Sequence, residues 1–105
     1  GRTMEIVLSG GMVPAQDAWE MGIVNRIVAH GKLESTVMGL AEEIARKSPY
    51  TTKVAKRAVR GALDLPLSEG LLMERSEFVA LFDTEDKEIG VRAFLERSNA
   101  DWVGR

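Results

Sequence analysis

Hydrophobic residues recur at intervals of three and four positions along most of this chain, the spacing that places side chains on one face of an α-helix. The pattern is clearest between residues 33 and 47, where apolar side chains fall on one face and charged residues take the other. Similar stripes predict helices that end near Ser9 and that span residues 14–21, 49–64, 69–83 and 85–97. The sequence therefore predicts a mainly α-helical protein.

Residues that typically start and stop helices separate these stripes. Ser48 and Pro49 break one helix and begin the next, because proline lacks the N–H group that a first helical turn leaves unpaired. Ser68 and Thr84 are predicted N-caps, whose hydroxyl oxygens accept hydrogen bonds from first-turn N–H groups. Acidic residues directly after Thr84 take the positions where the helix dipole favours negative charge.

One segment, residues 23–28, departs from the helical pattern. It is rich in β-branched residues and follows Gly22, which is predicted to end the preceding helix in a left-handed conformation that glycine adopts without strain. We expect a short β-strand here. A single strand cannot pair its own backbone groups, so this strand needs a partner in another chain or in a sheet formed by residues outside this sequence.

The composition is that of an ordinary globular domain, with 45% hydrophobic and 29% charged residues in 105. The net charge of −2 gives no overall attraction to nucleic acid or to an anionic membrane. No cysteine is present, which excludes disulfides, thiolate metal sites and cysteine nucleophiles. No apolar run approaches the roughly 20 residues that a membrane span needs. We therefore expect no nucleic-acid partner and no membrane partner.

Few side chains are candidates for catalysis. His30 is the only histidine, and no carboxylate partner or nucleophile elbow accompanies it, so we interpret it as a surface residue. Acidic residues around Glu42, Glu74 and Asp83 have simpler roles as solvated helix faces or first-turn charges. No group of residues has the spacing of a metal site. We expect no catalytic residue and no metal ligand in this chain.

The most suggestive group lies near the C-terminal end. It consists of Arg92, Arg97 and Arg105 with the aromatic residues Phe94 and Trp102. An arginine beside an exposed aromatic ring can hold a nucleotide, because the ring stacks on the base and the guanidinium meets a phosphate. On the residues alone we favour the simpler interpretation, in which Phe94 is a core residue and the arginines complement a helix C-terminus.

Short blocks of the sequence resemble one known family. The first is Leu-Ser-Gly at residues 8–10, and the second is the helix, glycine and Ile-Val-Asn-Arg-Ile that span residues 14–27. Further blocks follow at residues 41–45, 47–49, 55–58, 67–70 and 84–97, together with Glu74 and Phe78. In order and spacing these blocks resemble the C-terminal portion of the enoyl-CoA hydratase/isomerase (crotonase) family, over essentially the whole chain.

The resemblance implies a parent enzyme, a lyase or isomerase, that acts on acyl-CoA thioesters in fatty acid metabolism. In similar enzymes two backbone N–H groups polarise the thioester carbonyl and glutamates move protons. Those parts belong to a preceding β-β-α region that has no counterpart in this sequence, so we expect this fragment alone to be inactive. Coenzyme A enters as part of the substrate, and no separate cofactor is expected.

By the same resemblance, the C-terminal helices form the contacts of a homo-oligomer, a trimer or a hexamer, and cover part of the acyl-CoA site. Phe78 corresponds to an aromatic residue near the acyl pocket. Phe94 and Arg97 correspond to an aromatic residue and a cation near the adenine and phosphate of coenzyme A. Pro14 and Ile89 depart from the family pattern, in which a capping residue and a glutamate are usual at these positions.

We therefore expect residues 1–105 to form a single helical fragment. Residues 1–30 would end the crotonase core, and residues 31–105 would form the oligomerisation and CoA-covering region. The chain enters helical residues directly after Gly1, which indicates a piece of a longer protein, although an expression scar equally explains that glycine. The implied compartment is the cytoplasm, or the mitochondrial matrix in a eukaryote. The alternative is a free-standing helical protein-interaction module with no acyl-CoA role.

Overall fold

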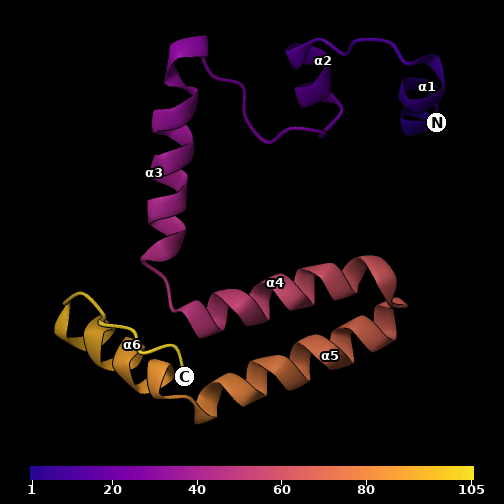
Figure 1. Cartoon of the computed structure of the whole chain (residues 1–105). Coiled ribbons are helices and arrows are strands. Elements are labelled where there is room, and N and C mark those ends of the chain that lie inside the picture. The colour runs from indigo at the N-terminus through magenta and orange to yellow at the C-terminus, as the bar shows by residue number, and fades with distance from the viewer. The chain divides into compact units, whose positions relative to one another are not determined.

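The computed structural model describes every residue from Gly1 to Arg105, and most of the chain is helical (Figure 1). The α-helices are α1 (Arg2–Ser9), α2 (Ala15–Glu20), α3 (Leu33–Ala45), α4 (Pro49–Asp64), α5 (Leu67–Ala80) and α6 (Glu85–Glu96). Two short 3₁₀ helices, η1 (His30–Lys32) and η2 (Leu81–Asp83), precede α3 and α6. The predicted mainly α-helical fold class is confirmed, and the helix boundaries lie within a few residues of those predicted.

The predicted strand at residues 23–28 is wrong. No strand forms in the chain, and this segment runs as bends and irregular backbone. Gly22 does end the helical segment in the expected left-handed conformation, with φ of 75°. The N–H groups of Ile23 and Val24 then donate to the carbonyl of Ala18, so the segment starts by folding back on α2. A β-strand requires a neighbouring strand, and no other part of this chain supplies one.

Contacts within the chain define two compact units, Gly1–Met38 and Gly39–Arg105, with the boundary inside α3. The first unit contains α1, α2 and η1, and the second contains α4, α5, η2 and α6. That residues 1–30 end a larger core, as the resemblance implies, stays a prediction. The second unit holds all three predicted site residues.

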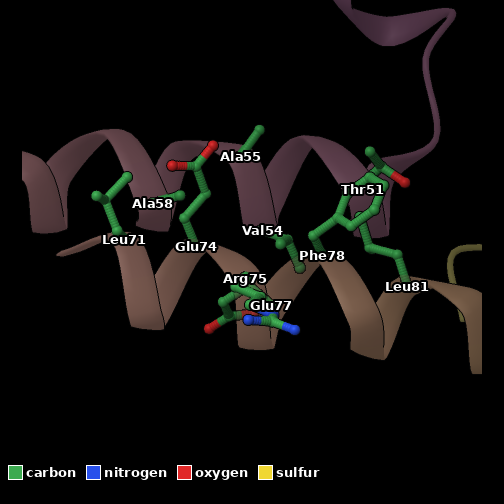
Figure 2. A pocket seen from close by; sticks show the side chains of 10 residues that line it. All are labelled: Thr51, Val54, Ala55, Ala58, Leu71, Glu74, Arg75, Glu77, Phe78 and Leu81. Carbon is green, nitrogen blue, oxygen red and sulfur yellow. The ribbon is translucent and has the colours of Figure 1, made fainter. Parts of the chain in front are cut away.

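In the second unit, α4 and α5 run side by side in opposite directions (Figure 1). Val54 of α4 is buried between the two helices (Figure 2). The helices approach closely at Gly61, where an added Cβ would lie 2.9 Å from Sδ of Met73. This helix pair is therefore the framework on which the grooves of the second unit are built.

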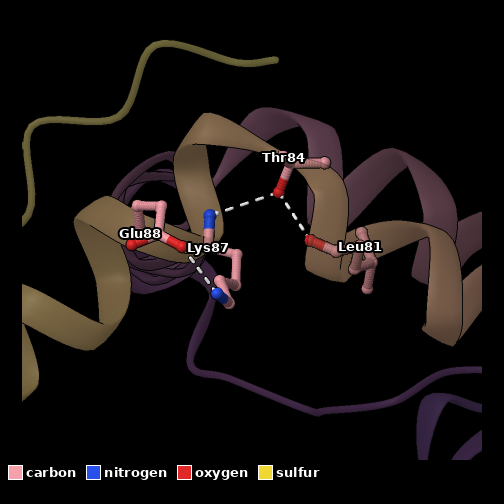
Figure 3. A network of polar contacts seen from close by, with 4 residues as sticks. All are labelled: Leu81, Thr84, Lys87 and Glu88. Carbon is pink, nitrogen blue, oxygen red and sulfur yellow. Dashed lines mark hydrogen bonds and ion pairs between the residues drawn. The ribbon is translucent and has the colours of Figure 1, made fainter.

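Hydroxyl groups cap two of the helices in the second unit. The Ser48 hydroxyl accepts a hydrogen bond of 3.1 Å from the N–H of Thr51 at the start of α4. At the start of α6 the Thr84 hydroxyl accepts from the N–H of Lys87 at 3.2 Å and donates to the carbonyl of Leu81 at 2.7 Å (Figure 3). The predicted cap at Thr84 is confirmed, and its second hydrogen bond ties α6 to η2.

The predicted cap at Ser68 is wrong. Helix α5 begins at Leu67, so Ser68 already lies in the first turn, and the N-cap is Pro66. No side chain caps this helix. The φ of −55° at Pro66 suits the residue that leads into a helix, which explains why the helix starts before the serine.

Little of the apolar surface is covered. Ala18, Val54 and Ala93 are the only buried hydrophobic residues. Every α-helix carries exposed large hydrophobic residues, including Met4, Trp19, Leu33, Val59, Leu71 and Phe94. The apolar stripes of the sequence therefore form helix faces that this chain itself leaves open. None of the helices combines the length and the apolar character needed to cross a membrane.

Candidate functional site

A groove of about 490 Å³ runs between α4 and α5 in the second unit (Figure 2). Its α4 side is formed by small and branched residues, with Ala55 and Ala58 next to Val54. On the other side Leu71 and Phe78 project from α5 towards α4 (Figure 2). Because these side chains are spaced seven residues apart, they lie on the same face of the helix. The groove can accept an apolar group.

Charged residues also line this groove. Glu74 projects from α5 towards α4, between Leu71 and Phe78 (Figure 2). Glu77, which also lines the groove, forms an ion pair with Arg57 of α4. Glu74 is exposed to solvent. A solvated carboxylate lacks the desolvation that normally tunes a catalytic acid or base, so Glu74 is a weak candidate for proton transfer.

Phe78 is the predicted site residue that the structure places in a groove. It is 59% exposed, and its ring packs edge-on against that of Phe82, with ring centres 5.3 Å apart and planes inclined at 78°. It also lines a second groove of about 410 Å³, to which Val91 of α6 and Trp102 contribute. Phe78 therefore presents apolar surface to both grooves of the second unit.

Phe94 and Arg97 lie together at the C-terminal end of α6. The Phe94 ring is 83% exposed, so the favoured interpretation of Phe94 as a core residue is wrong in this chain. Arg97 directly follows α6 and is the only residue other than glycine with a positive φ, at 52°. Its N–H donates to the carbonyls of Ala93 and Phe94, which closes the helix end. An exposed aromatic ring and an exposed cation thus lie three positions apart at the end of α6.

The C-terminal aromatic and arginine group predicted from the sequence is only partly assembled. The Trp102 indole Nε1 donates to the carbonyl of Arg46 at 2.8 Å, and Arg105 Nε pairs with Glu85 at 3.0 Å. Glu85 begins α6, whereas Phe94 lies near its end. Phe78 lines grooves to which neither Phe94 nor Arg97 contributes. Phe94 and Arg97 therefore share the C-terminal end of α6, and Phe78, Trp102 and Arg105 lie elsewhere in the second unit.

Asp86 is the residue whose role the sequence did not show. Its side chain is 2% exposed, although the sequence indicated only a first-turn charge. Oδ2 accepts from the Ser48 hydroxyl at 2.5 Å, and Oδ1 accepts from the N–H groups of Val103 at 2.8 Å and Gly104 at 3.0 Å. The sequence gives no local signal for this arrangement, because its partners lie 38, 17 and 18 positions away.

The protonation of Asp86 follows from these contacts. Burial raises the pKa of the carboxyl group, but the hydrogen bonds from the Ser48 hydroxyl and from two backbone N–H groups outweigh it and lower the pKa below the usual value. The group is therefore a carboxylate near neutral pH. Both carboxylate oxygens accept hydrogen bonds from the protein, so the group joins separate segments of the chain.

The remaining candidates form no further site. His30 is exposed at the start of η1, in agreement with its interpretation as a surface residue. No group of three or more histidine, cysteine or acidic side chains has an arrangement that could hold a metal ion.

Comparison with known proteins places the chain in a family. The model of the enoyl-CoA hydratase/isomerase family matches residues 1–105, which is the entire chain. The chain belongs to the enoyl-CoA hydratase/isomerase family. The resemblance inferred from the sequence blocks is confirmed.

Curated relatives from this family are considerably longer than the chain. A probable enoyl-CoA hydratase of Rhizobium meliloti is 39% identical over 99% of the chain and 40% of its own length. The 2,3-dehydroadipyl-CoA hydratase of Escherichia coli is 36% identical over 96% of the chain and 40% of its own length. A probable mitochondrial enoyl-CoA hydratase of Dictyostelium discoideum is also 36% identical, over 36% of its own length. The chain thus spans about two fifths of the length of these relatives.

Solved structures of the family share the fold of the chain. An enoyl-CoA hydratase of Bacillus anthracis aligns over the whole chain and 41% of its own length, with 31% identity and a TM-score of 0.93. An enoyl-CoA hydratase subunit of Geobacillus kaustophilus aligns over 99% of the chain and 40% of its own length, with 38% identity and a TM-score of 0.88.

Proposed function

We propose that this chain is the C-terminal part of an enoyl-CoA hydratase/isomerase-type enzyme that acts on acyl-CoA thioesters. The observation that carries the proposal is a family match over the whole chain that spans only about 40% of the relatives' length. Exposed apolar faces on every α-helix support it, because such faces are typical of surfaces that pack against further protein.

In this proposal the chain supplies contacts and part of a binding site, and the catalytic groups lie in the rest of the enzyme. The described side chains support that division. The exposed Glu74 is solvated, and the hydrogen bonds of the buried Asp86 are all made within the protein. Stabilising a thioester enolate requires preorganised donors, which these residues do not offer. We therefore expect the 105-residue chain alone to have no hydratase or isomerase activity.

The proposed coenzyme A contact is the pair formed by Phe94 and Arg97. The Phe94 ring is free to stack on an adenine, and the Arg97 guanidinium can meet a phosphate with paired hydrogen bonds. The left-handed backbone at Arg97 fixes where this cation leaves the helix end. Phe78, exposed at the edge of two apolar grooves, is the proposed acyl-side residue.

The test compares the binding of coenzyme A and dephospho-coenzyme A to the assembled parent enzyme by calorimetry. We expect a preference for coenzyme A, because the 3′-phosphate is the group that the cation would meet. Arg97→Ala should abolish this preference, with a loss of about tenfold in affinity for coenzyme A. Arg92→Ala removes an exposed cation from the same helix and should leave the preference intact. An unchanged preference in Arg97→Ala would reject the contact.

The assembly and location of the parent enzyme are further parts of the proposal. We expect a trimer or a hexamer in which exposed apolar faces of these helices meet neighbouring subunits. We expect it in the cytoplasm, or in the mitochondrial matrix if the source is a eukaryote. A relative in Pongo abelii is named a mitochondrial enoyl-CoA hydratase. Native mass spectrometry of the parent enzyme tests the assembly, and a monomeric mass contradicts it.

The second candidate function is a helical protein-interaction module without an acyl-CoA role. The observation that favours it is the open, mostly apolar groove between α4 and α5, because amphipathic helices commonly dock in such grooves. The mass of the native polypeptide separates the two functions. A native chain of 11.5 kDa would favour the module, and a chain more than twice as long would favour the enzyme.

A further inference from the structure

Residues 100–105, which we call the C-terminal strap, pack back onto the second unit without forming a helix. The Trp102 indole Nε1 donates to the carbonyl of Arg46, just after α3. The N–H of Asp86 donates to the carbonyl of Arg105 at 3.0 Å. The strap thus reaches the end of one helix and the first turn of another, with irregular backbone between these two attachments.

The Asp86 carboxylate is a further attachment of the strap. It accepts two of its three hydrogen bonds from consecutive N–H groups in the strap, at Val103 and Gly104. The third comes from Ser48, the N-cap of α4. No lysine, arginine or histidine forms an ion pair with Asp86. A buried carboxylate with no counter-charge depends on such donors, so releasing the strap removes two of the three hydrogen bonds that stabilise the Asp86 charge.

The strap also positions a large side chain. The Trp102 ring lies against α6 at Gly90, where an added Cβ would be 3.1 Å from Cη2 of the indole. The same ring lines the second groove, as do Phe78 and Phe82, which form an aromatic pair. Trp102 directly precedes the two residues that Asp86 holds, so the position of the ring depends on the strap being attached.

We propose that the buried Asp86 carboxylate is the attachment point of the C-terminal strap and thereby positions Trp102 as one wall of the groove that contains Phe78. Asp86 is a positioning residue in this arrangement, because it acts on the groove through the strap that carries Trp102. The inference stands on the contacts within the second unit and does not depend on the proposed acyl-CoA role.

The test uses the intact protein labelled with 5-fluorotryptophan and observed by ¹⁹F NMR. The Trp102 resonance is assigned by its loss in Trp102→Phe, and Trp19, in the first unit, serves as an internal reference. Asp86→Ala should move the Trp102 resonance to the position of a solvent-exposed tryptophan and leave the Trp19 resonance in place. A Trp102 resonance that stays at its original position in Asp86→Ala would overturn the proposal.

Two further variants keep the result interpretable. Asp83→Ala removes an exposed acid three residues earlier that forms no side-chain hydrogen bond, and it should leave Trp102 unchanged. Val103→Pro deletes one strap donor without touching any helix, so it tests the attachment even if Asp86→Ala loses helical circular dichroism. Helical dichroism should persist in Val103→Pro while the Trp102 resonance shifts, and an unshifted resonance there would also overturn the proposal.

Discussion

Asp86 keeps a negative charge in a nearly solvent-free position, where an isolated carboxylate would be costly. Three donors compensate for the lost hydration, and together they hold its pKa below the usual value. Each donor comes from a segment distant in sequence, so the carboxylate joins α4, α6 and the strap at one point.

We predict that this charge makes the stability of the second unit depend on acid pH. Because the folded pKa of Asp86 is lowered, its contribution is fully present above the unfolded pKa of about 4 and is lost as the pH falls through the lower folded value. Urea unfolding at a series of pH values should show that the free energy of unfolding declines below about pH 4. This decline should be smaller in Asp86→Ala.

Glu88 supplies the control for that experiment. Its pKa is also lowered, by a hydrogen bond and charge interaction with the neighbouring Lys87 (Figure 3), but this contact is exposed and screened by solvent. Glu88→Gln should therefore retain nearly the whole acid-dependent decline. If the free energy of unfolding falls equally at acid pH in Asp86→Ala and Glu88→Gln, the buried Asp86 carboxylate is not the source of the decline.

Replacing two helical glycines, Gly61 and Gly90, by alanine should change the stability of the protein in opposite directions. Alanine gains about 1 kcal/mol over glycine inside a helix. At Gly61 the added methyl group meets the flexible end of Met73, which can move, so we expect a net gain of about 0.5 kcal/mol. At Gly90 it meets the rigid indole of Trp102, so we expect a net loss of about 1 kcal/mol. Thermal unfolding followed by circular dichroism compares the melting temperatures of the two variants. Equal shifts in melting temperature would contradict the contacts at Gly61 and Gly90.

Helix starts show which local signals the sequence carried. Thr84 was predicted as an N-cap and acts as one, and Pro49 begins α4 as expected. The cap at Ser68 was mispredicted because α5 begins directly after Pro66. These ends depend on residues one to three positions apart, so the sequence alone largely determines them.

The two hydroxyl caps should differ in their contribution to stability. Thr84→Ala removes a half-buried cap and should cost about 1 kcal/mol. Ser48→Ala removes a cap and also a donor to the buried Asp86, and should cost about 2–3 kcal/mol. Chemical denaturation measures the free energy of unfolding of both variants. The comparison holds when the two variants show the same dependence of that free energy on denaturant concentration. If Ser48→Ala lowers the free energy of unfolding no more than Thr84→Ala does, the Ser48 hydroxyl does not stabilise the buried Asp86 carboxylate.

Elements that depend on distant partners were the ones the sequence could not predict. Residues 23–28 have strand-like composition, but a strand forms only beside another strand, and this chain has none. The grooves beside Phe78 and the attachment of the strap depend on contacts between helices and on partners up to 56 positions apart. The spacing of apolar residues within one helix gives no information about such contacts. The residue types alone indicated a larger C-terminal group of aromatic residues and arginines, and the family resemblance narrowed it to Phe94 and Arg97.

At the scale of the whole molecule, apolar surface exceeds what the chain can bury. Sequence patterning correctly showed where the apolar faces lie. Only three hydrophobic residues are buried, whereas exposed apolar side chains occur on every α-helix.

We predict that the isolated 105-residue chain self-associates through these faces and binds a hydrophobic dye. Light scattering over a range of concentrations, with dye fluorescence recorded in parallel, measures both properties. A compact monomer that binds no dye at the highest concentration would contradict the prediction. The same measurement on a more complete parent enzyme should show a defined oligomer and weak dye binding, because the faces are then covered.

The left-handed backbone at Arg97 has a consequence for engineering this chain. A position with φ of 52° after a helix is one where glycine is favoured over any residue with a side chain. Arg97→Gly should therefore raise the melting temperature while removing the cation proposed to meet the coenzyme A phosphate. A screen that selects variants for heat resistance alone would thus enrich a substitution that discards a candidate recognition group.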